Sequence, residues 1–252
     1  MFEVPLETVF ALVGAGFVAG FVDSIAGGGG LITLPVLLLS GASPVQALST
    51  NKVQGVFGAA TAAISYASSG HVNLRRQLRA AVLAFAGGLI GALLVSHIPT
   101  SGLRAALPVV LIAIAAFFAF KKGLNDDDRL ERIPAATFTA LVVPLVGFYD
   151  GLIGPGAGAF YMIGFVTLAG YGVLRATAHT KLLNFASNLG GLVAFAATGS
   201  PWWAVGLAMG AAQIAGARLG SKLAMRKGAK IVKPLLVTTS TVLALRLLWQ
   251  ML

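Results

Sequence analysis

The sequence predicts an all-α, polytopic membrane protein made of two inverted repeats of about five helical segments each, with broken or half-helices. Of its 252 residues 57% are hydrophobic and only 10% are charged, against the roughly 25% charged residues of soluble domains. A chain of this composition cannot cover a water-facing surface. Long stretches contain no Asp, Glu, Lys or Arg, several of them near or above the ~20 residues that span a bilayer: 24–51, 80–103, 105–120, 151–174 and 182–217.

Apolar runs between polar or Gly/Pro breaks give the expected helical segments. The segment at 30–40 is only ~16 Å long as a helix, about half of a ~30 Å hydrocarbon core. We therefore expect a half-helix that forms a broken hairpin with the preceding segment. The first half contains segments at 6–26, 30–40, 45–68, 77–97 and 103–120. The second half contains segments at 134–153, 156–170, 173–198, 202–222 and 233–251.

Basic residues gather in three connections, which the positive-inside rule places in the cytoplasm. Both termini then lie outside, and the protein is expected to be a multi-pass protein of a bacterial-type inner (plasma) membrane. The net charge of +10 is explained by these clusters, so nucleic acid is not an expected partner. The connections carry 13 of the 18 Lys and Arg residues: Arg75, Arg76 and Arg79; Lys121, Lys122, Arg129 and Arg132; and Arg218, Lys222, Arg226, Lys227, Lys230 and Lys233.

The two halves resemble each other in sequence. At an offset of 127, Gly20, Phe21, Asp23, Gly27 and Gly29 match Gly147, Phe148, Asp150, Gly154 and Gly156. At an offset of 129, Ala47, Lys52, Gly70, Leu78, Gly87 and Gly91 match Ala176, Lys181, Gly199, Leu207, Gly216 and Gly220. Five segments per half is an odd number, so the second copy enters the membrane from the opposite side, as in secondary transporters.

These observations define one structural unit in three parts. The first transmembrane repeat is expected at 1–121, a cytoplasmic linker at 122–133 and the second repeat at 134–252. Within the linker, the acidic run Asp126–Asp128 is expected to be simply solvated.

Asp23 and Asp150 are the carboxylates that lie inside apolar sequence, and they occupy equivalent positions in the two repeats. Ionisable residues inside a membrane usually face a partner or a cavity. Each of these two precedes a glycine-rich break. One interpretation is proton coupling or gating, and the other is that each Asp caps the exposed amides of its own broken helix.

The glycine-rich breaks suggest an anion-binding site. Gly28, Gly29 and Gly30 let the backbone approach a ligand closely, and irregular backbone inside a membrane is tolerated where it is buried or lines a cavity. A helix that restarts at Leu31 would direct its N-terminal amides and positive dipole end at the midplane. The second half repeats this pattern around Gly156. Tight helix packing is the alternative use of these glycines.

The next segment in each half begins with unusually polar residues. Lys52 and Lys181 lie roughly 11 to 12 Å into their segments, where they would neutralise an anion, pair with the two aspartates, or extend to an interface. The neighbouring amides could bind anion oxygens or bridge helices; they are Asn51, Gln54, Asn184 and Asn188, the last two one helical turn apart.

Other chemistry finds little support in the sequence. His179 could titrate near neutral pH and is a candidate for gating or proton coupling, although a structural role is the simpler interpretation. The three His residues are too dispersed for a metal site. No phosphate-binding loop and no nucleophile with a base is present. We therefore expect no cofactor, no metal and no enzymatic activity.

Three motifs resemble the TauE/SafE family of sulfite and organosulfonate exporters. They are Gly27-Gly-Gly-Gly-x-x-x-x-Pro35; Ala47-Leu-Ser-Thr-Asn-Lys-Val-Gln54; and Ala176-Thr-Ala-His-Thr-Lys-Leu-Leu-Asn184 continuing through Ser187-Asn-Leu-Gly190. The Ser-Thr-Asn-Lys-x-Gln version is closer to the less characterised members. The resemblance implies a plasma-membrane transporter of small sulfur-containing anions such as sulfite, sulfoacetate, another sulfonate or thiosulfate, generally working in the export direction.

The sequence and this resemblance together predict a secondary transporter that works by alternating access on a small anion. An anion channel, or a transporter of another small organic anion, is the alternative. We expect membrane lipid to surround the protein. Small residues on many helix faces permit a homodimer without requiring one.

Overall fold

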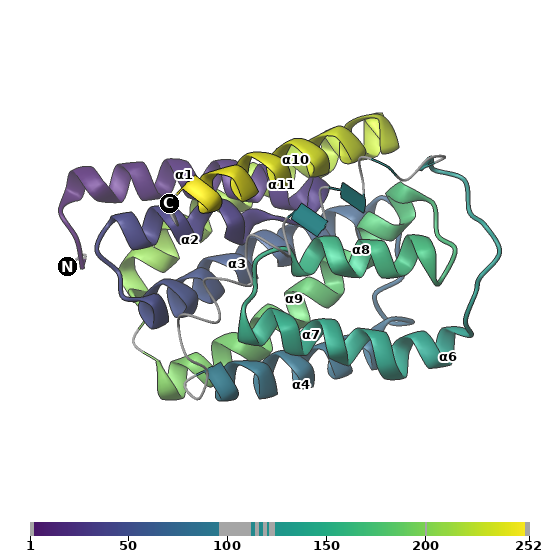
Figure 1. Cartoon of the computed structure of the whole chain (residues 1–252), viewed down its shortest axis with the longest axis horizontal. Coiled ribbons are helices and arrows are strands. Elements are labelled where there is room, and N and C mark those ends of the chain that lie inside the picture. The colour runs from purple at the N-terminus through teal and green to yellow at the C-terminus, as the bar shows by residue number, and fades with distance from the viewer. Residues whose placement is uncertain are drawn as a thin grey trace.

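The computed structural model describes residues 3–95, 124–199 and 201–249, together with residues 112, 113, 116, 117 and 120. Within this part of the chain the regular structure is helical, as predicted (Figure 1). The segment predicted at 103–120 and the connection near His97 lie mostly outside the described residues. The elements are α1 (Leu6–Ala26), α2 (Gly29–Leu39), α3 (Pro44–Ser68), α4 (Leu78–Leu94), α6 (Ala135–Thr137), η2 (Phe138–Val142), α7 (Val143–Leu152), α8 (Ala157–Thr167), α9 (Val173–Thr198), α10 (Trp203–Lys227) and α11 (Ala229–Trp249).

The first break follows from local backbone chemistry. α1 ends where Gly27 adopts a left-handed conformation (φ 74°) and its N–H donates to the carbonyl of Asp23 at 2.9 Å. The short α2 then begins at Gly29. The expected restart at Leu31 was therefore wrong by two residues, because the Asp23 carboxylate caps the new helix and so brings Gly29 into its first turn.

The helix that opens the second half is continuous from α6 through η2 to α7, but it contains a π-helical turn at Phe138–Val142. In this turn the Val143 N–H donates to the carbonyl of Phe138, one residue further back than in an α-helix. Pro144 follows directly and has no N–H to donate. The wider turn therefore lies where proline interrupts the regular bonding pattern.

The helices pack as a bundle in which distant segments of the chain lie together. α1 packs most extensively on α10, and α4 packs on α7 and α9, while α3 lies between α9 and α10. In Figure 1, α1 begins at the end of the molecule marked N, whereas α6 and α7 begin at the opposite end. α2 turns back toward the end where α1 begins, and α8 turns back toward the end where α6 begins.

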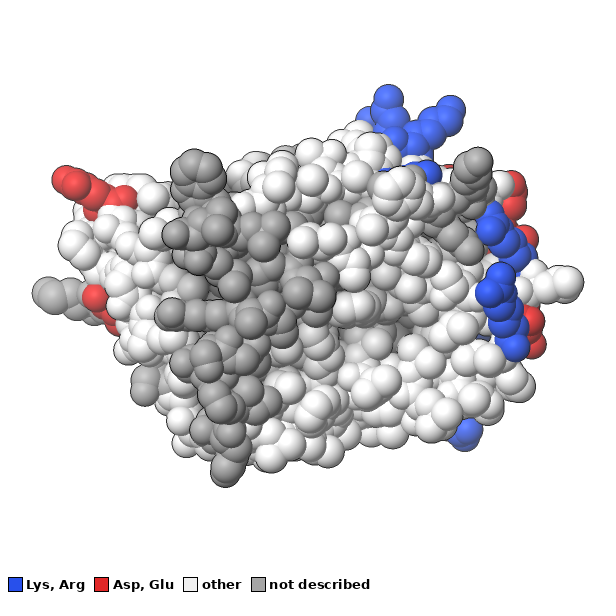
Figure 2. All heavy atoms as spheres, in the orientation of Figure 1, with Lys and Arg blue, Asp and Glu red and all other residues white. Residues whose placement is uncertain are grey.

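The distribution of apolar and polar side chains is the reverse of that in a soluble protein. Large apolar side chains such as Phe10 (69% exposed) and Leu145 (68% exposed) cover the outside, while Lys52 and Lys181 are buried. α1 and the continuous helix Ala135–Leu152 are long and apolar enough to cross a membrane by length and composition. On the face shown in Figure 2, the charged residues among those described lie toward the two ends, and the described surface between them is uncharged. Such a surface suits a lipid environment.

The sequence had suggested that the linker acids Asp126 and Asp128 are simply solvated, and this prediction was wrong. The Asp126 carboxylate accepts N–H groups of Leu174 (3.0 Å) and Ala229 (3.0 and 3.1 Å), at the N-terminal ends of α9 and α11. Asp128 accepts the N–H of Gly172 at 2.8 Å and pairs with Arg175. Negative charge is favourable at helix N-termini, so this part of the linker fastens two helices of the second half.

Candidate functional site

The two broken hairpins meet at their break points. A Cβ added to Gly27 would lie 2.8 Å from the Cα of Gly158, and a Cβ added to Gly158 would lie 2.8 Å from the Cα of Gly27. Real side chains do not tolerate such a distance, so glycine is required on both sides of this contact. The start of α8 and the end of α1 are thereby brought together in the interior.

Two lysine–aspartate pairs cross between the halves at this point. The Lys52 Nζ on α3 lies 2.7 Å from the Asp150 Oδ1 at the end of α7 and also donates to the Asp150 carbonyl at 2.6 Å. Lys181 on α9 donates to the carbonyl of Asp23 and lies 3.7 Å from its Oδ2. Each lysine therefore neutralises one carboxylate and also binds a carbonyl near a helix C-terminus, where positive charge is favourable.

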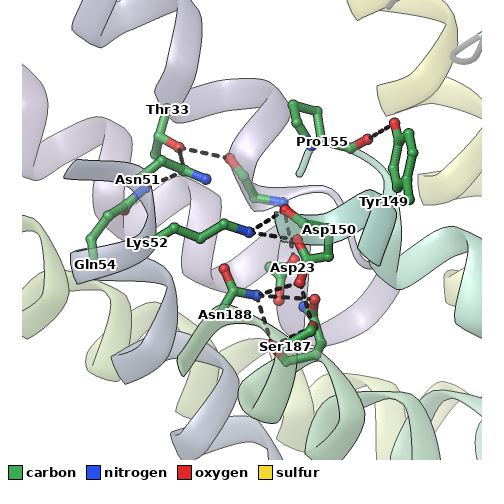
Figure 3. Close-up of polar contacts among 12 residues, drawn as sticks. Asp23, Thr33, Asn51, Lys52, Gln54, Tyr149, Asp150, Pro155, Ser187 and Asn188 are labelled. Carbon is green, nitrogen blue, oxygen red and sulfur yellow. Dashed lines mark hydrogen bonds and ion pairs between the residues drawn. The ribbon is translucent and has the colours of Figure 1, made fainter. Parts of the chain in front are cut away.

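The two aspartates differ in their remaining partners. The Asp23 Oδ1 accepts the N–H groups of Gly28 (3.0 Å) and Gly29 (3.1 Å), so it caps α2. The Asp150 Oδ2 instead accepts from the Ser187 hydroxyl and from Asn188 Nδ2 at 3.1 Å (Figure 3). Within the described part of the chain, no side chain accepts from the first-turn N–H groups of α8, so Gly158 and Ala159 lack the side-chain acceptor that α2 has.

Side-chain amides complete the site. The Asn51 Oδ1 accepts from Thr33 at 2.7 Å and from Gln54 at 2.8 Å (Figure 3), and Gln54 in turn accepts from Gln213. On α9, the Asn188 amide donates to the side-chain oxygen of Asn184 at 3.1 Å. Because the side-chain oxygens of Asn51 and Asn184 are engaged in this way, their NH₂ groups remain to donate toward the space between the helices.

These groups surround a small cavity, which we call the central cavity. Its volume is about 30 Å³, enough for one or two water molecules. The lining is almost entirely polar or glycine: Asp23, Gly27, Gly28, Gly29, Gly30, Asn51, Gly55, Asp150, Gly154, Gly156, Ala157, Gly158, Asn184, Asn188 and Gln213.

The charges of the site balance. The side chains of Lys52, Lys181 and Asp150 are at most 3% exposed, and that of Asp23 is 14% exposed. Removing either partner of a buried ion pair leaves an uncompensated charge, which costs several kcal/mol. The four side chains therefore behave as a neutral unit, with the amides as additional donors.

Comparison with known proteins places this arrangement in a family. The chain matches the family model described as sulfite exporter TauE/SafE over residues 12–247. The chain belongs to the TauE/SafE family. No solved structure matches it.

Curated relatives of this TauE/SafE protein align over almost their whole length. A probable membrane transporter protein of Sinorhizobium sp, ORF9, is 56% identical over 93% of this chain and 90% of the relative. The probable membrane transporter protein YfcA of Escherichia coli K12 is 44% identical over 92% of this chain and 86% of the relative. A probable membrane transporter protein of Haemophilus influenzae is 39% identical over 98% and 97%, respectively.

The TauE/SafE fold brings most of the predicted site residues together. The ones that line the central cavity are Gly28, Gly29, Gly30, Asn51, Gly156, Asn184, Asn188, Asp23 and Asp150. Lys52 and Lys181 stand directly behind the two aspartates, and Gln54 stands behind Asn51. His179 does not join this group, because its ring packs against Phe165 and Tyr171 near the linker.

Several residues of the site were not singled out from the sequence. Gln213 lines the cavity from α10, and Thr33 holds Asn51 in place. Gln213 is the lone side-chain amide in the segment predicted at 202–222, which is the signal that could have found it. Thr33 carries no such signal, since threonine is common in membrane helices. Among the described residues, no group of His, Cys, Asp and Glu could hold a metal ion.

Proposed function

We propose that the protein is a proton-coupled secondary transporter that exports a small sulfur-containing anion, such as sulfite or a sulfonate, across a bacterial inner membrane. The observation that carries the proposal is the buried meeting of two broken hairpins, each with an aspartate, beside lysines supplied by the opposite half. Membership of the TauE/SafE family supports the same class of cargo. The relatives' printed names support a membrane transporter.

In this proposal the anion binds in an enlarged central cavity. The first turn of α8 lines the cavity and supplies N–H groups that Asp23 does not occupy, whereas Gly28 and Gly29 of the first hairpin already donate to Asp23. The NH₂ groups of Asn51 and Asn184 add donors from two further helices. The present volume of about 30 Å³ is too small for an anion with three oxygen atoms around sulfur. Binding therefore requires the two halves to separate at this point, which is the movement that alternating access needs.

Charge balance explains why protons would accompany the anion. The two lysines are already neutralised by Asp23 and Asp150, so an added anion would leave a net negative charge in a low-dielectric interior. Protonation of one carboxylate removes that charge and frees its lysine for the anion. Asp150 is the better candidate for this proton, because its carboxylate caps no helix, whereas Asp23 holds the start of α2.

In this proposal, the inverted repeat predicted from the sequence allows one half to rock against the other. Pairs of contacts recur at positions related by the sequence offsets: Gly91 lies against Phe148 as Gly220 lies against Phe21, and Lys52 meets Asp150 as Lys181 meets Asp23. Because the contacts are equivalent, the arrangement in which the two halves exchange roles should have a similar energy. A repeat of this kind can therefore exchange an inward-open for an outward-open state.

The proposed function is tested by sulfite flux in proteoliposomes, measured with and without a pH gradient. We expect flux in the wild-type protein that increases with the gradient. A Lys52→Ala/Lys181→Ala variant should lose it, because both counter-charges for the anion are removed. Asp150→Asn, which mimics a permanently protonated carboxylate, should keep measurable flux but lose the response to the gradient.

Three outcomes would speak against the proposal. Absence of wild-type flux above that of empty liposomes rejects sulfite as the cargo and moves the search to other sulfonates and carboxylates. Flux in Asp150→Asn that still follows the gradient rejects Asp150 as the proton carrier. Full flux in the double lysine variant rejects the site. Size-exclusion elution of each variant as a single species serves as the folding control.

A further inference from the structure

A second cavity lies away from the central one, at the end of the molecule that carries Arg76, Arg79 and Arg175, which we call the basic end. Its volume is about 760 Å³, within the range of sites for organic ligands, whereas the central cavity holds about 30 Å³. We call it the basic-end cavity. It lies between the connection from α3 to α4, the turn η2 and the ends of α8 and α9 that face the linker, and its polar lining includes Arg76, Gln77, Arg79, Tyr171, Arg175 and His179.

Two of its arginines are free to bind a ligand. Arg175 is paired with Asp128 and lies 3.9 Å above the ring of Tyr171. Burial alone would raise the pKa of the Asp128 carboxyl, but hydrogen bonds from the Gly172 N–H and from Arg175 hold that pKa below its ordinary value, so this pair stays charged. Arg76 and Arg79, by contrast, form no ion pair within the described part of the chain. Guanidinium groups bind phosphate, sulfonate and carboxylate in a forked geometry.

One wall of the cavity is aromatic. Phe165 stacks on Tyr171 with ring centroids 5.3 Å apart, and the His179 ring contacts both of them. Phe138 continues this wall at a centroid distance of 4.7 Å from Phe165. Phe138 and Phe165 are only 3% and 4% exposed and support the wall from behind, while the half-buried rings of Tyr171 and His179 present it to the cavity. Such a wall buries an apolar body, which a bare inorganic anion does not have.

Gln77 adds an unused acceptor. The residue is 8% exposed, and its Nε2 donates to the carbonyl of His179 at 3.3 Å. Its Oε1 has no hydrogen-bond partner in the described structure. A buried polar atom without a partner is energetically unfavourable, because it has lost its hydrogen bonds to water. The π-helical turn at Phe138–Val142 borders the same cavity, and such turns are frequent at functional sites.

We propose that the basic-end cavity binds an amphipathic anion, in which a phosphate, sulfonate or carboxylate group is joined to an apolar body that also carries a hydrogen-bond donor. Arg76 and Arg79 bind the charged group, the aromatic wall buries the body, and Gln77 Oε1, which is buried without a partner in this structure, accepts from the donor after its side chain turns toward the cavity. An anionic phospholipid and a soluble organic anion share this chemistry. The site is separate from the central one and does not depend on the cargo that the transporter carries.

Binding is tested on the purified, detergent-solubilised full chain with two probes. 6-Hydroxynaphthalene-2-sulfonate represents a soluble anion and is measured by equilibrium dialysis against protein-free micelles. Phosphatidylglycerol, offered in an equal mixture with phosphatidylcholine, represents a lipid and is counted by native mass spectrometry. We expect Arg76→Ala/Arg79→Ala to weaken retention of the bound probe at least tenfold, because both charge-assisted contacts are lost.

A matched variant separates a local site from general surface charge. Lys222→Ala/Arg226→Ala removes the same charge from exposed positions on α10 that do not line the cavity, and it should change retention less than twofold. Ala140→Trp, at an exposed lining position, should block the cavity without removing any charge. Naphthalene-2-sulfonate, which lacks the hydroxyl donor, should bind about fivefold more weakly than the hydroxylated probe, and Gln77→Met should abolish that difference.

The outcomes distinguish the sources and can overturn the proposal. Selective retention of either probe, lost in the arginine and Ala140→Trp variants, supports it and identifies the ligand as lipid or soluble anion. Retention of neither probe overturns it, as does an equal loss in the Lys222→Ala/Arg226→Ala control. Sulfite flux is measured separately in each variant, so a negative binding result says nothing against the central site.

Discussion

At the residue scale, each buried lysine of the central site binds two oxygen atoms of one aspartate, the carboxylate and the backbone carbonyl. Of the alternatives that the sequence left open, the structure shows the pairing with the aspartates, and the meeting with an anion belongs to the proposed function. A lysine that pairs with an aspartate is also positioned to meet an anion once the carboxylate is protonated. The pairs therefore connect the two halves, and in the proposed mechanism they would also regulate the charge available to the anion.

The Lys52–Asp150 pair should be strongly coupled in stability. Lys52→Met leaves the Asp150 carboxylate buried without its counter-charge, and Asp150→Asn does the same to the Lys52 ammonium group. Each single variant should therefore lower the free energy of unfolding by roughly 3 kcal/mol or more. The double variant removes both charges and should recover most of that loss. Unfolding by titration with a denaturing detergent measures all three, with the exposed Lys222→Met as control. Additive losses in the double variant would show that the two side chains do not interact.

At the element scale, the proposed function depends on two helices that stop in the interior. α1 and α7 end beside short helices of 11 residues each, α2 and α8, and the breaks touch at Gly27 and Gly158. The hydrogen bonds of the Tyr66 hydroxyl to the Ser24 carbonyl (2.9 Å) and of the Tyr149 hydroxyl to the Pro155 carbonyl (2.7 Å) satisfy acceptors at these breaks. The irregular backbone is thus stabilised within the protein, as the absence of water in a membrane requires.

Gly158→Ala tests the contact between the breaks. The added methyl group would meet the Gly27 backbone at 2.8 Å, so the hairpins must move apart, and we expect sulfite flux to fall at least tenfold together with a loss of thermal stability. Gly14→Ala is the matched control, because nothing lies within 4 Å of its added methyl group. Alanine favours a helix over glycine by up to about 1 kcal/mol, so the control should be neutral or slightly more stable. Equal behaviour of the two variants would contradict a tight contact.

At the scale of the whole molecule, charge is separated along the long axis. On the face shown, Lys and Arg lie at one end together with linker acids, and the opposite end carries acidic residues (Figure 2). This asymmetry supports the proposed orientation with the basic end in the cytoplasm and both termini outside.

The orientation can be tested by cysteine labelling without prior engineering, since the chain contains no Cys. Glu7→Cys near the N-terminus should react with a membrane-impermeant maleimide added to intact spheroplasts. Leu130→Cys, at a linker position that is 94% exposed, should react only after the membrane is opened. The reverse pattern would invert the proposed topology, and labelling of both sites in intact spheroplasts would reject it.

How much of this could be read from the sequence depends on whether a feature is local. The bounds of α1, α3 and α9 agree with prediction to within a residue, because breaks in apolar periodicity mark helix ends directly. The interpretation of Asp126 and Asp128 failed, because their cap positions depend on helices that follow some 45 and 100 residues later. Which lysine would meet which aspartate was likewise open, since repeat symmetry allows pairing within a half or between halves.

Counterflow of labelled sulfite tests the central claim most directly, namely that one buried site binds the anion and is exposed alternately to each side. Proteoliposomes loaded with unlabelled sulfite should take up external labelled sulfite faster, and to a transient excess, than liposomes without internal sulfite. A Lys52→Ala/Lys181→Ala variant should show no such acceleration. Sulfite flux that is unaffected by internal sulfite would contradict alternating access and indicate a channel through the same helices.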